Sequence, residues 1–148
     1  MRKKWVFWGF FVFLAGIQFL PILEVEKNPP IEKVPTWDSE TTKQFFSRAC
    51  ADCHSHETRW PWYSHVAPIS WLIRYHVREG REHFNISRHG LQKKDKSHEA
   101  AEELEDGSMP LLPYLWLHPE ARLTPAEKRQ FVEGLRRTFP PREKSWIE

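Results

Sequence analysis

Two cysteines spaced three apart, with a histidine directly after the second, constrain this chain more than any other feature. They are Cys50 and Cys53, followed by His54, and the 148 residues contain no other cysteine. Random placement gives this arrangement in about 7 of 10,000 chains of this composition. On a helix, positions i, i+3 and i+4 share one face, so both sulfurs and the imidazole point the same way. The spacing predicts that two thioether bonds hold a porphyrin while the histidine binds its iron.

Three other chemistries use closely spaced cysteines. A thioredoxin-like redox pair follows a strand in a βαβ unit, and no such pattern precedes Cys50. A structural zinc site needs four ligands, so His56 or His65 would have to join the three residues of the motif. A disulfide between residues this close closes almost no loop and stabilises little. The sequence favours haem attachment over these alternatives.

The surrounding sequence resembles the bacterial single-haem haem-binding domain family, and the motif itself resembles the attachment site of c-type cytochromes. The similarity covers about residues 38–139. Its motifs are the attachment motif, residues 58–64 (TRWPWYS), Ala67-Pro68 with Trp71, residues 76–81 (HVREGR), residues 107–111 (GSMPL) and residues 114–121 (YLWLHPEA). The resemblance implies one haem c, attached through Cys50 and Cys53 with His54 as the proximal ligand.

Met109 is the predicted distal iron ligand. Gly107 has the character of the residue that ends a short helix over about 97–105. Pro110 keeps Met109 in extended backbone, so its thioether can be aimed by a rigid segment. Class I cytochromes c carry their methionine ligand on a similar loop before a final helix. The competing interpretations are that Met109 only fills core space, or that His76, on a helix expected from Pro68 to about Phe84, is the distal ligand instead.

Residues 5–23 (WVFWGFFVFLAGIQFLPIL) form an apolar run with Gln18 as its one strongly polar member. As a helix it would span roughly 28 Å, close to the hydrocarbon thickness of a bilayer. Preceding basic residues predict a single-pass anchor, residues 1–23, in the inner membrane, with the remainder in the periplasm. A cleaved signal peptide is the alternative, but small residues are missing at the expected cleavage position. Residues 24–37, rich in proline, are expected to form an extended linker to a haem domain over 38–148.

The charge distribution excludes nucleic acid as a partner. The chain has 22 basic and 20 acidic residues, and three of the basic ones precede the apolar run. The domain therefore lacks the basic stripe that DNA or RNA binding requires. Periplasmic or membrane redox proteins, met through small transient contacts, and the lipid bilayer, through residues 5–23, are the expected partners.

Local signals predict an all-α, cytochrome-c-like domain. Asp38 or Ser39 caps a helix leading into Cys50. Thr124 and Glu127 form a capping box for a last helix, whose buried stripe contains Phe131 and Leu135 and which ends before Pro140. We expect this last helix to pack against the helix leading into Cys50 and so close the domain.

The function that follows is one-electron transfer rather than catalysis, because no nucleophile or base accompanies the motif and both axial positions of the iron are filled. Two alternatives remain: a haem sensor or peroxidase-like protein with a labile sixth ligand, and a haem-binding interaction module that does not cycle its redox state.

Overall fold

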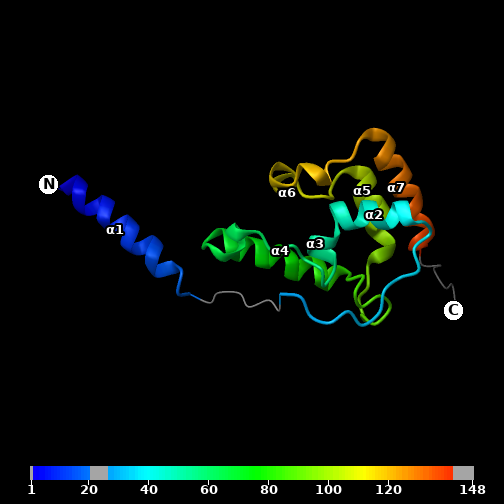
Figure 1. The fold of residues 1–148 in the computed structure, drawn as a ribbon, viewed down its shortest axis with the longest axis horizontal. Helices are drawn as coiled ribbons and strands as arrows, with labels where there is room; N and C mark the ends of the chain where they lie inside the picture. The colour runs from blue at the N-terminus through cyan, green and yellow to red at the C-terminus, as the bar shows by residue number, and fades with distance from the viewer. Residues whose placement is uncertain (1, 21–26, 142–148) are drawn as a thin grey trace, which may run out of the picture.

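The structure is a computed structural model that describes residues 2–20 and 27–141. Its longer helices are α1 (Arg2–Ile17), α2 (Glu40–Ala49), α4 (Ile69–His83) and α7 (Pro125–Thr138). The shorter elements are α3 (Ala51–His54), α5 (Ala100–Asp106), α6 (Leu112–Leu117) and the 3-10 turns η1 (Trp62–His65), η2 (Ser97–Glu99) and η3 (Pro119–Ala121). Within the described ranges there is no strand, and helices joined by loops make up the whole domain (Figure 1). The predicted all-α fold class is confirmed.

The N-terminal helix is shorter than the sequence predicts. Instead of covering residues 5–23, α1 ends at Ile17, where the Gln18 side chain turns onto another part of the chain. Its amide nitrogen donates to the Ala67 carbonyl at 3.1 Å, and its amide oxygen accepts from the Ala67 N–H at 2.9 Å. Among residues 2–20 and 27–141, no helix has both the length and the apolar character needed to cross a bilayer. The expected transmembrane helix is therefore not supported, and residues 21–26, shared between the predicted anchor and linker, lie outside the described residues.

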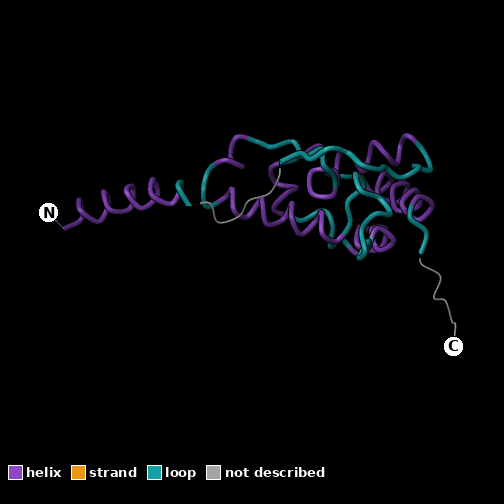
Figure 2. The backbone as a smooth tube through the Cα atoms, turned by 90° about the horizontal axis from the view of Figure 1, so that it is seen from below, coloured by secondary structure: helices purple, strands orange, loops and turns teal. Residues whose placement is uncertain are grey.

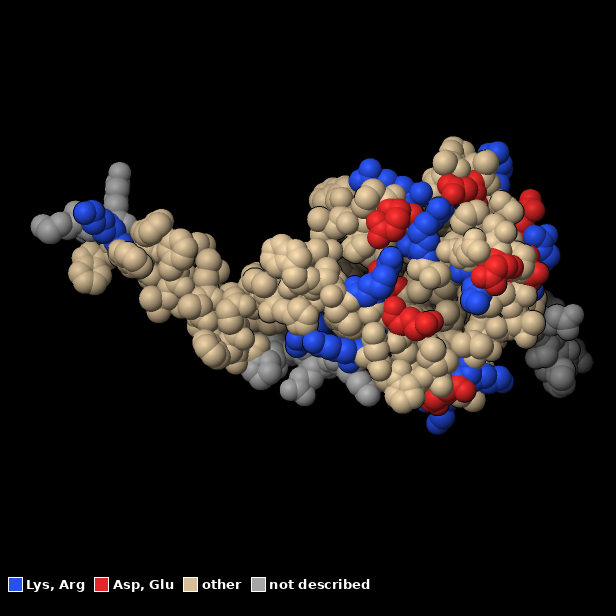
Figure 3. Space-filling model, in the orientation of Figure 1, with Lys and Arg blue, Asp and Glu red and all other residues tan. Residues whose placement is uncertain are grey.

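Apart from this contact, α1 projects away from the domain in both views (Figures 1 and 2). Its large apolar side chains are exposed, with Trp5 at 79% and Trp8 at 65%. Figure 3 shows an uncharged surface along α1 beyond its basic start, whereas acidic and basic residues are mixed over the visible face of the domain.

The core lies where α2, α5 and α7 meet. Phe46, Phe131 and Leu135 are each at most 2% exposed, and the rings of Phe45 and Phe131 pack with their centroids 5.7 Å apart. Fully burying each such side chain stabilises the fold by about 1.5–3 kcal/mol. The expected packing of the last helix against the one leading into Cys50 is confirmed.

The helix ends follow the predicted capping signals. The Ser39 hydroxyl accepts from the Thr42 N–H and starts α2. Thr124 and Glu127 form the reciprocal capping box of α7. Gly107 ends α5 in the left-handed conformation, with φ of 87°, which glycine adopts without strain.

Residues 27–37, called the strap below, lie against the domain instead of forming a free spacer. The N–H groups of Glu32 and Lys33 both donate to the Ser87 carbonyl, at 2.9 and 3.0 Å. The Pro30 carbonyl accepts from His56 Nδ1 at 2.9 Å, and Trp37 packs on the core. This stretch is extended, as its prolines predict, but it is fixed to the loops around the attachment motif.

Candidate functional site

The attachment motif lies at a break between two helices. α2 ends at Ala49, and Cys50, with φ of −128°, separates it from the single turn α3. The Cys50 carbonyl accepts from the N–H groups of Cys53 and His54, at 3.1 and 3.0 Å. The predicted helix leading into Cys50 is confirmed as α2, and the motif itself forms a separate turn that keeps the helical spacing from Cys50 onward. The break changes the direction of the chain, and the i, i+3, i+4 relation among the three residues is preserved.

Cys50 and Cys53 are not joined to each other by a disulfide, and burial raises the pKa of each as a thiol to about 12. At neutral pH these thiols are fully protonated, since a buried thiolate lacks solvation. Thiol-redox enzymes depend on the opposite situation, a cysteine whose pKa is lowered so that the thiolate attacks a disulfide. The thioredoxin-like interpretation of Cys50 and Cys53 is thus disfavoured by their surroundings.

His54 is held in the state that a metal ligand requires. Its Nδ1 lies 3.1 Å from the Phe84 carbonyl oxygen, which can only accept, so Nδ1 carries the proton and Nε2 keeps its lone pair. The imidazole stacks on the Phe84 ring with centroids 4.3 Å apart and 16° between the planes. Burial lowers the pKa of His54 to about 4, so the ring is neutral at physiological pH.

Gly80 allows α4 to lie directly on the attachment turn. A Cβ at this position would be 2.5 Å from the Cys53 carbonyl oxygen, well inside van der Waals contact. Any larger residue would push α4 away from α3. Glycine at position 80 therefore sets the distance between the turn that carries His54 and the helix that carries His76.

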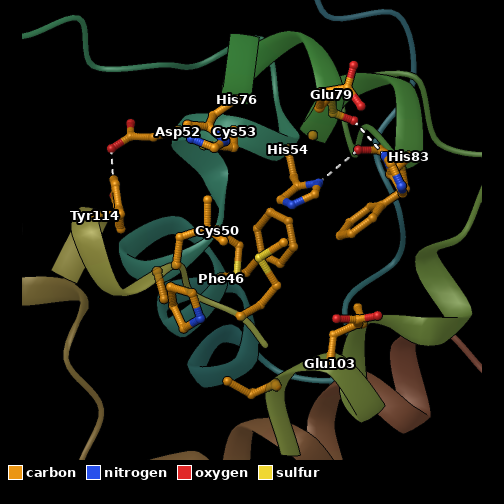
Figure 4. A pocket seen from close by; sticks show the side chains of 18 of the residues that line it. Phe46, Cys50, Asp52, Cys53, His54, His76, Glu79, His83, Glu103 and Tyr114 are labelled. Carbon is orange, nitrogen blue, oxygen red and sulfur yellow. Dashed lines mark hydrogen bonds between the residues drawn. The ribbon is translucent and has the colours of Figure 1, made fainter. Parts of the chain in front are cut away.

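A cavity of about 390 Å³ opens in front of these residues. Cys50, Cys53, His54 and Met109 all line it, so the structure brings the four predicted site residues together. The rival ligand His76 lines it as well. Figure 4 shows His54 projecting into this space, with Glu79 carried by α4 and Glu103 by α5.

The other residues that line the cavity are largely apolar, and several charged side chains lie between them. Apolar lining comes from Phe46, Ala49, Phe84, Leu104, Leu111 and Leu135, and charged or titratable lining from Glu79, His83, Lys96, Glu99 and Glu103. His56 and His65, the candidates for a fourth zinc ligand, are not among the described residues that line it. Within the described part of the chain, no group of three or more His, Cys, Asp or Glu side chains is arranged to hold a metal ion.

These features fit a haem. The cavity volume lies in the range of about 300–1,000 Å³ that is typical of cofactor sites. Two thiols, a neutral imidazole with its free nitrogen and a methionine are the donors that covalent attachment and axial ligation of haem require. The apolar wall supplies the low-polarity surroundings in which a porphyrin is bound.

A carboxylate inside the motif makes contacts that the sequence did not predict. Asp52 is 6% exposed, and its oxygens accept from the Arg59 N–H at 2.9 Å, from Arg59 Nη2 at 3.1 Å and from the Tyr114 hydroxyl at 2.7 Å. Burial, followed by the charge of Asp52, raises the pKa of Tyr114, so its hydroxyl stays protonated and donates. Arg59 and Tyr114 both fall in motifs of the family resemblance, which was the one available signal for them.

Comparison with known proteins identifies the family. A family model described as a haem-binding domain matches residues 12–137, most of the chain. The chain therefore belongs to the haem-binding domain family, and haem is the cofactor that this membership assigns. No curated protein and no solved structure matches the chain.

Proposed function

We propose that this member of the haem-binding domain family is a c-type electron carrier with one covalently attached haem. Cys50 and Cys53 would hold the porphyrin through thioether bonds, and the His54 imidazole and the Met109 thioether would bind its iron. The observation that carries this proposal is the meeting of these four side chains on one cavity, although Met109 lies far along the chain from the attachment motif.

When bound, the haem supplies an iron that changes its charge by one electron. The chain's own residues fix the orientation of the proposed ligands and the polarity of their surroundings. The Phe84 carbonyl fixes the His54 ring through Nδ1, and the apolar part of the wall would shield the metal from water. The soft Met109 thioether favours the reduced iron and raises the potential relative to a second histidine. With His54 and Met109 both bound to it, the iron would offer no open site to peroxide or oxygen, which is the behaviour expected of an electron carrier rather than an enzyme.

The visible spectrum of the full chain, matured with the haem-attachment machinery, tests the axial ligands. We expect low-spin spectra in both oxidation states and, in the oxidised protein, the weak far-red band of sulfur–iron ligation. Met109→Ala should abolish that band and lower the potential, because a weaker or absent sixth ligand no longer favours ferrous iron.

His76→Ala is the matched control, since His76 lines the same cavity from α4. The proposal predicts that its spectrum keeps the far-red band. If His76→Ala changes the axial spectrum while Met109→Ala does not, the iron is bound by two histidines and the assignment of Met109 is wrong.

We further propose that the domain works in the periplasm, at the inner membrane, with redox proteins as partners. Covalent haem attachment takes place outside the bacterial cytoplasm, and the exposed apolar residues of α1 support attachment to lipid. Fractionation tests this location: the full chain should sediment with membranes, and a variant with Phe7, Phe10, Phe11 and Phe13 replaced by serine should be released. Equal partitioning of the two proteins would contradict it.

A further inference from the structure

The segment that carries Met109 has little apolar packing to hold it. None of the six residues of α6, which follows Met109, is buried. Three of its apolar side chains are instead exposed, Leu112 at 68%, Trp116 at 72% and Leu117 at 60%. Since burial of apolar side chains is what fixes most helices on a domain, the position of this segment must depend on more specific contacts.

One such contact lies before α6. The Met109 N–H donates to the Glu103 carbonyl at 2.9 Å, which fixes the start of the segment on α5. Pro110 and Pro113 stiffen the backbone that follows, because each fixes its φ angle. Movement at Met109 is therefore transmitted to α6, and restraint of α6 is transmitted to Met109.

The second contact is the hydrogen bond from Tyr114 to Asp52. It joins α6 directly to the attachment turn, because Asp52 lies between Cys50 and Cys53. Figure 4 shows this link at the edge of the pocket, with the Tyr114 hydroxyl 2.7 Å from Oδ2 of Asp52. A hydrogen bond to a charged acceptor is shorter and stronger than one between neutral groups.

The acceptor is itself held in place. Arg59 donates to Oδ1 of Asp52 through its backbone N–H at 2.9 Å and its Nε at 3.3 Å, and to Oδ2 through Nη2 at 3.1 Å. Arg59 also lies 3.7 Å from Glu120 in η3, just beyond α6. The Asp52 carboxylate is thus oriented by one residue and presented to Tyr114 as a fixed point on the rigid turn.

We propose that Tyr114 and Asp52 are positioning residues for the distal ligand: their hydrogen bond ties the Met109 segment to the attachment turn and so holds the thioether at the sixth position of the iron. This inference rests on the proposed function, because it requires Met109 to be the distal ligand. Its consequence is that loss of the Tyr114 hydroxyl, which is not itself a ligand, increases the fraction of molecules in which methionine has left the iron.

The test uses the full chain with its haem attached and measures carbon monoxide binding to the ferrous protein by stopped flow. Carbon monoxide enters only when the sixth position is open, so its binding rate follows the open fraction. Tyr114→Phe removes the hydroxyl and keeps the ring, and we expect the rate to rise by about tenfold, the effect of losing one hydrogen bond to a charged group. The far-red band of the oxidised protein should weaken in the same variant.

Tyr63→Phe is the matched control, because Tyr63 lies in η1 and is not among the described residues lining the cavity. It should leave both readouts unchanged. Asp52→Asn removes the acceptor's charge, so it should act in the same direction, and Tyr114→Phe should have little further effect in the Asp52→Asn background. Additive effects of the two changes would contradict a shared hydrogen bond.

The outcomes separate this inference from the proposed function. If the Tyr114→Phe protein keeps wild-type carbon monoxide kinetics and the far-red band, the positioning role is overturned. The assignment of Met109 as the distal ligand still stands in that case, provided that Met109→Ala loses the far-red band. If Met109→Ala itself retains the far-red band, the methionine assignment fails, and the positioning role fails with it.

Discussion

Gly80 shows how strongly one residue can control this site. Its hydrogen faces the Cys53 carbonyl, and an added Cβ would lie 2.5 Å from that oxygen. Gly80→Ala must displace α4 from the attachment turn, and we expect it to lower the free energy of unfolding by about 1–3 kcal/mol, as overpacking does elsewhere. Because the displaced elements carry His54 and line the cavity, the haem spectrum should change as well. Urea unfolding and visible spectroscopy measure the two effects.

Gly134→Ala provides the comparison for Gly80→Ala. A Cβ there would lie 2.0 Å from the Thr42 hydroxyl, where α7 contacts α2, and neither residue lines the cavity. It should destabilise the protein without altering the spectrum. If both alanine variants lose stability and both leave the spectrum as in the wild type, Gly80 matters only for packing.

At the level of individual residues, the sequence predicted four side chains that the structure brings to one cavity, but not the contacts that hold them there. Spacing alone selects Cys50, Cys53 and His54, and the flanking glycine and proline select Met109. The Phe84 carbonyl that fixes His54, and the bond from Tyr114 to Asp52, join residues far apart in the chain. Such pairs depend on how helices pack, which no local pattern encodes.

Among the elements, α7 has the clearest local determinant of stability. The Glu127 carboxylate accepts from the Thr124 N–H and from Arg48 of α2, and the first of these bonds is the main reason that its pKa falls to about 2. A lowered carboxyl pKa stabilises the folded state above the unfolded pKa, and the stabilisation is lost as pH falls through the folded value. Stability should therefore decline between about pH 4.5 and pH 2.

Glu127→Gln removes the titrating group, so the variant should be less stable at pH 7 and its stability should depend less on pH below 4.5. Thr124→Ala, which removes the other half of the box, should lower the free energy of unfolding by about 1 kcal/mol. Chemical denaturation at pH 7 and pH 3 measures both. An undiminished pH dependence in Glu127→Gln would assign the acid sensitivity to other carboxylates.

Helices were predictable where a local end signal, such as Pro68 at a start or Gly107 at an end, accompanied an apolar stripe. The predicted helix from Pro68 to about Phe84 corresponds to α4, and the short helix over about 97–105 to η2 and α5. The break at Cys50, the end of α1 at Ile17 and the strap over residues 27–37 were not predicted. Distant residues hold two of these features: Ala67 bonds to Gln18 at the end of α1, and Ser87 bonds to Lys33 in the strap.

In the whole molecule, the cavity lies beside the aromatic core, and Phe46, Leu104 and Leu135 belong to both. The core side chains of α2, α5 and α7 bury one another, whereas the space between the attachment turn, α4 and the Met109 segment is lined by apolar groups that a haem would cover. A chain without haem, obtained as Cys50→Ala/Cys53→Ala, should therefore be less stable by several kcal/mol, on the order of 10 °C in Tm.

Limited proteolysis of the haem-free protein should cut first in the segment around Met109. This segment is held on the domain by the hydrogen bonds described above and not by apolar packing on the core. Equal Tm values for the loaded and haem-free chains would show that the cofactor contributes nothing to the fold.

Intact mass spectrometry tests the central claim most directly, that two thioether bonds attach one haem to this chain. Protein produced together with the haem-attachment machinery should be heavier than its sequence by one haem. After unfolding, alkylation should add nothing, since neither sulfur is free. A colourless protein of unmodified mass, with two cysteines that alkylate once unfolded, would contradict the account.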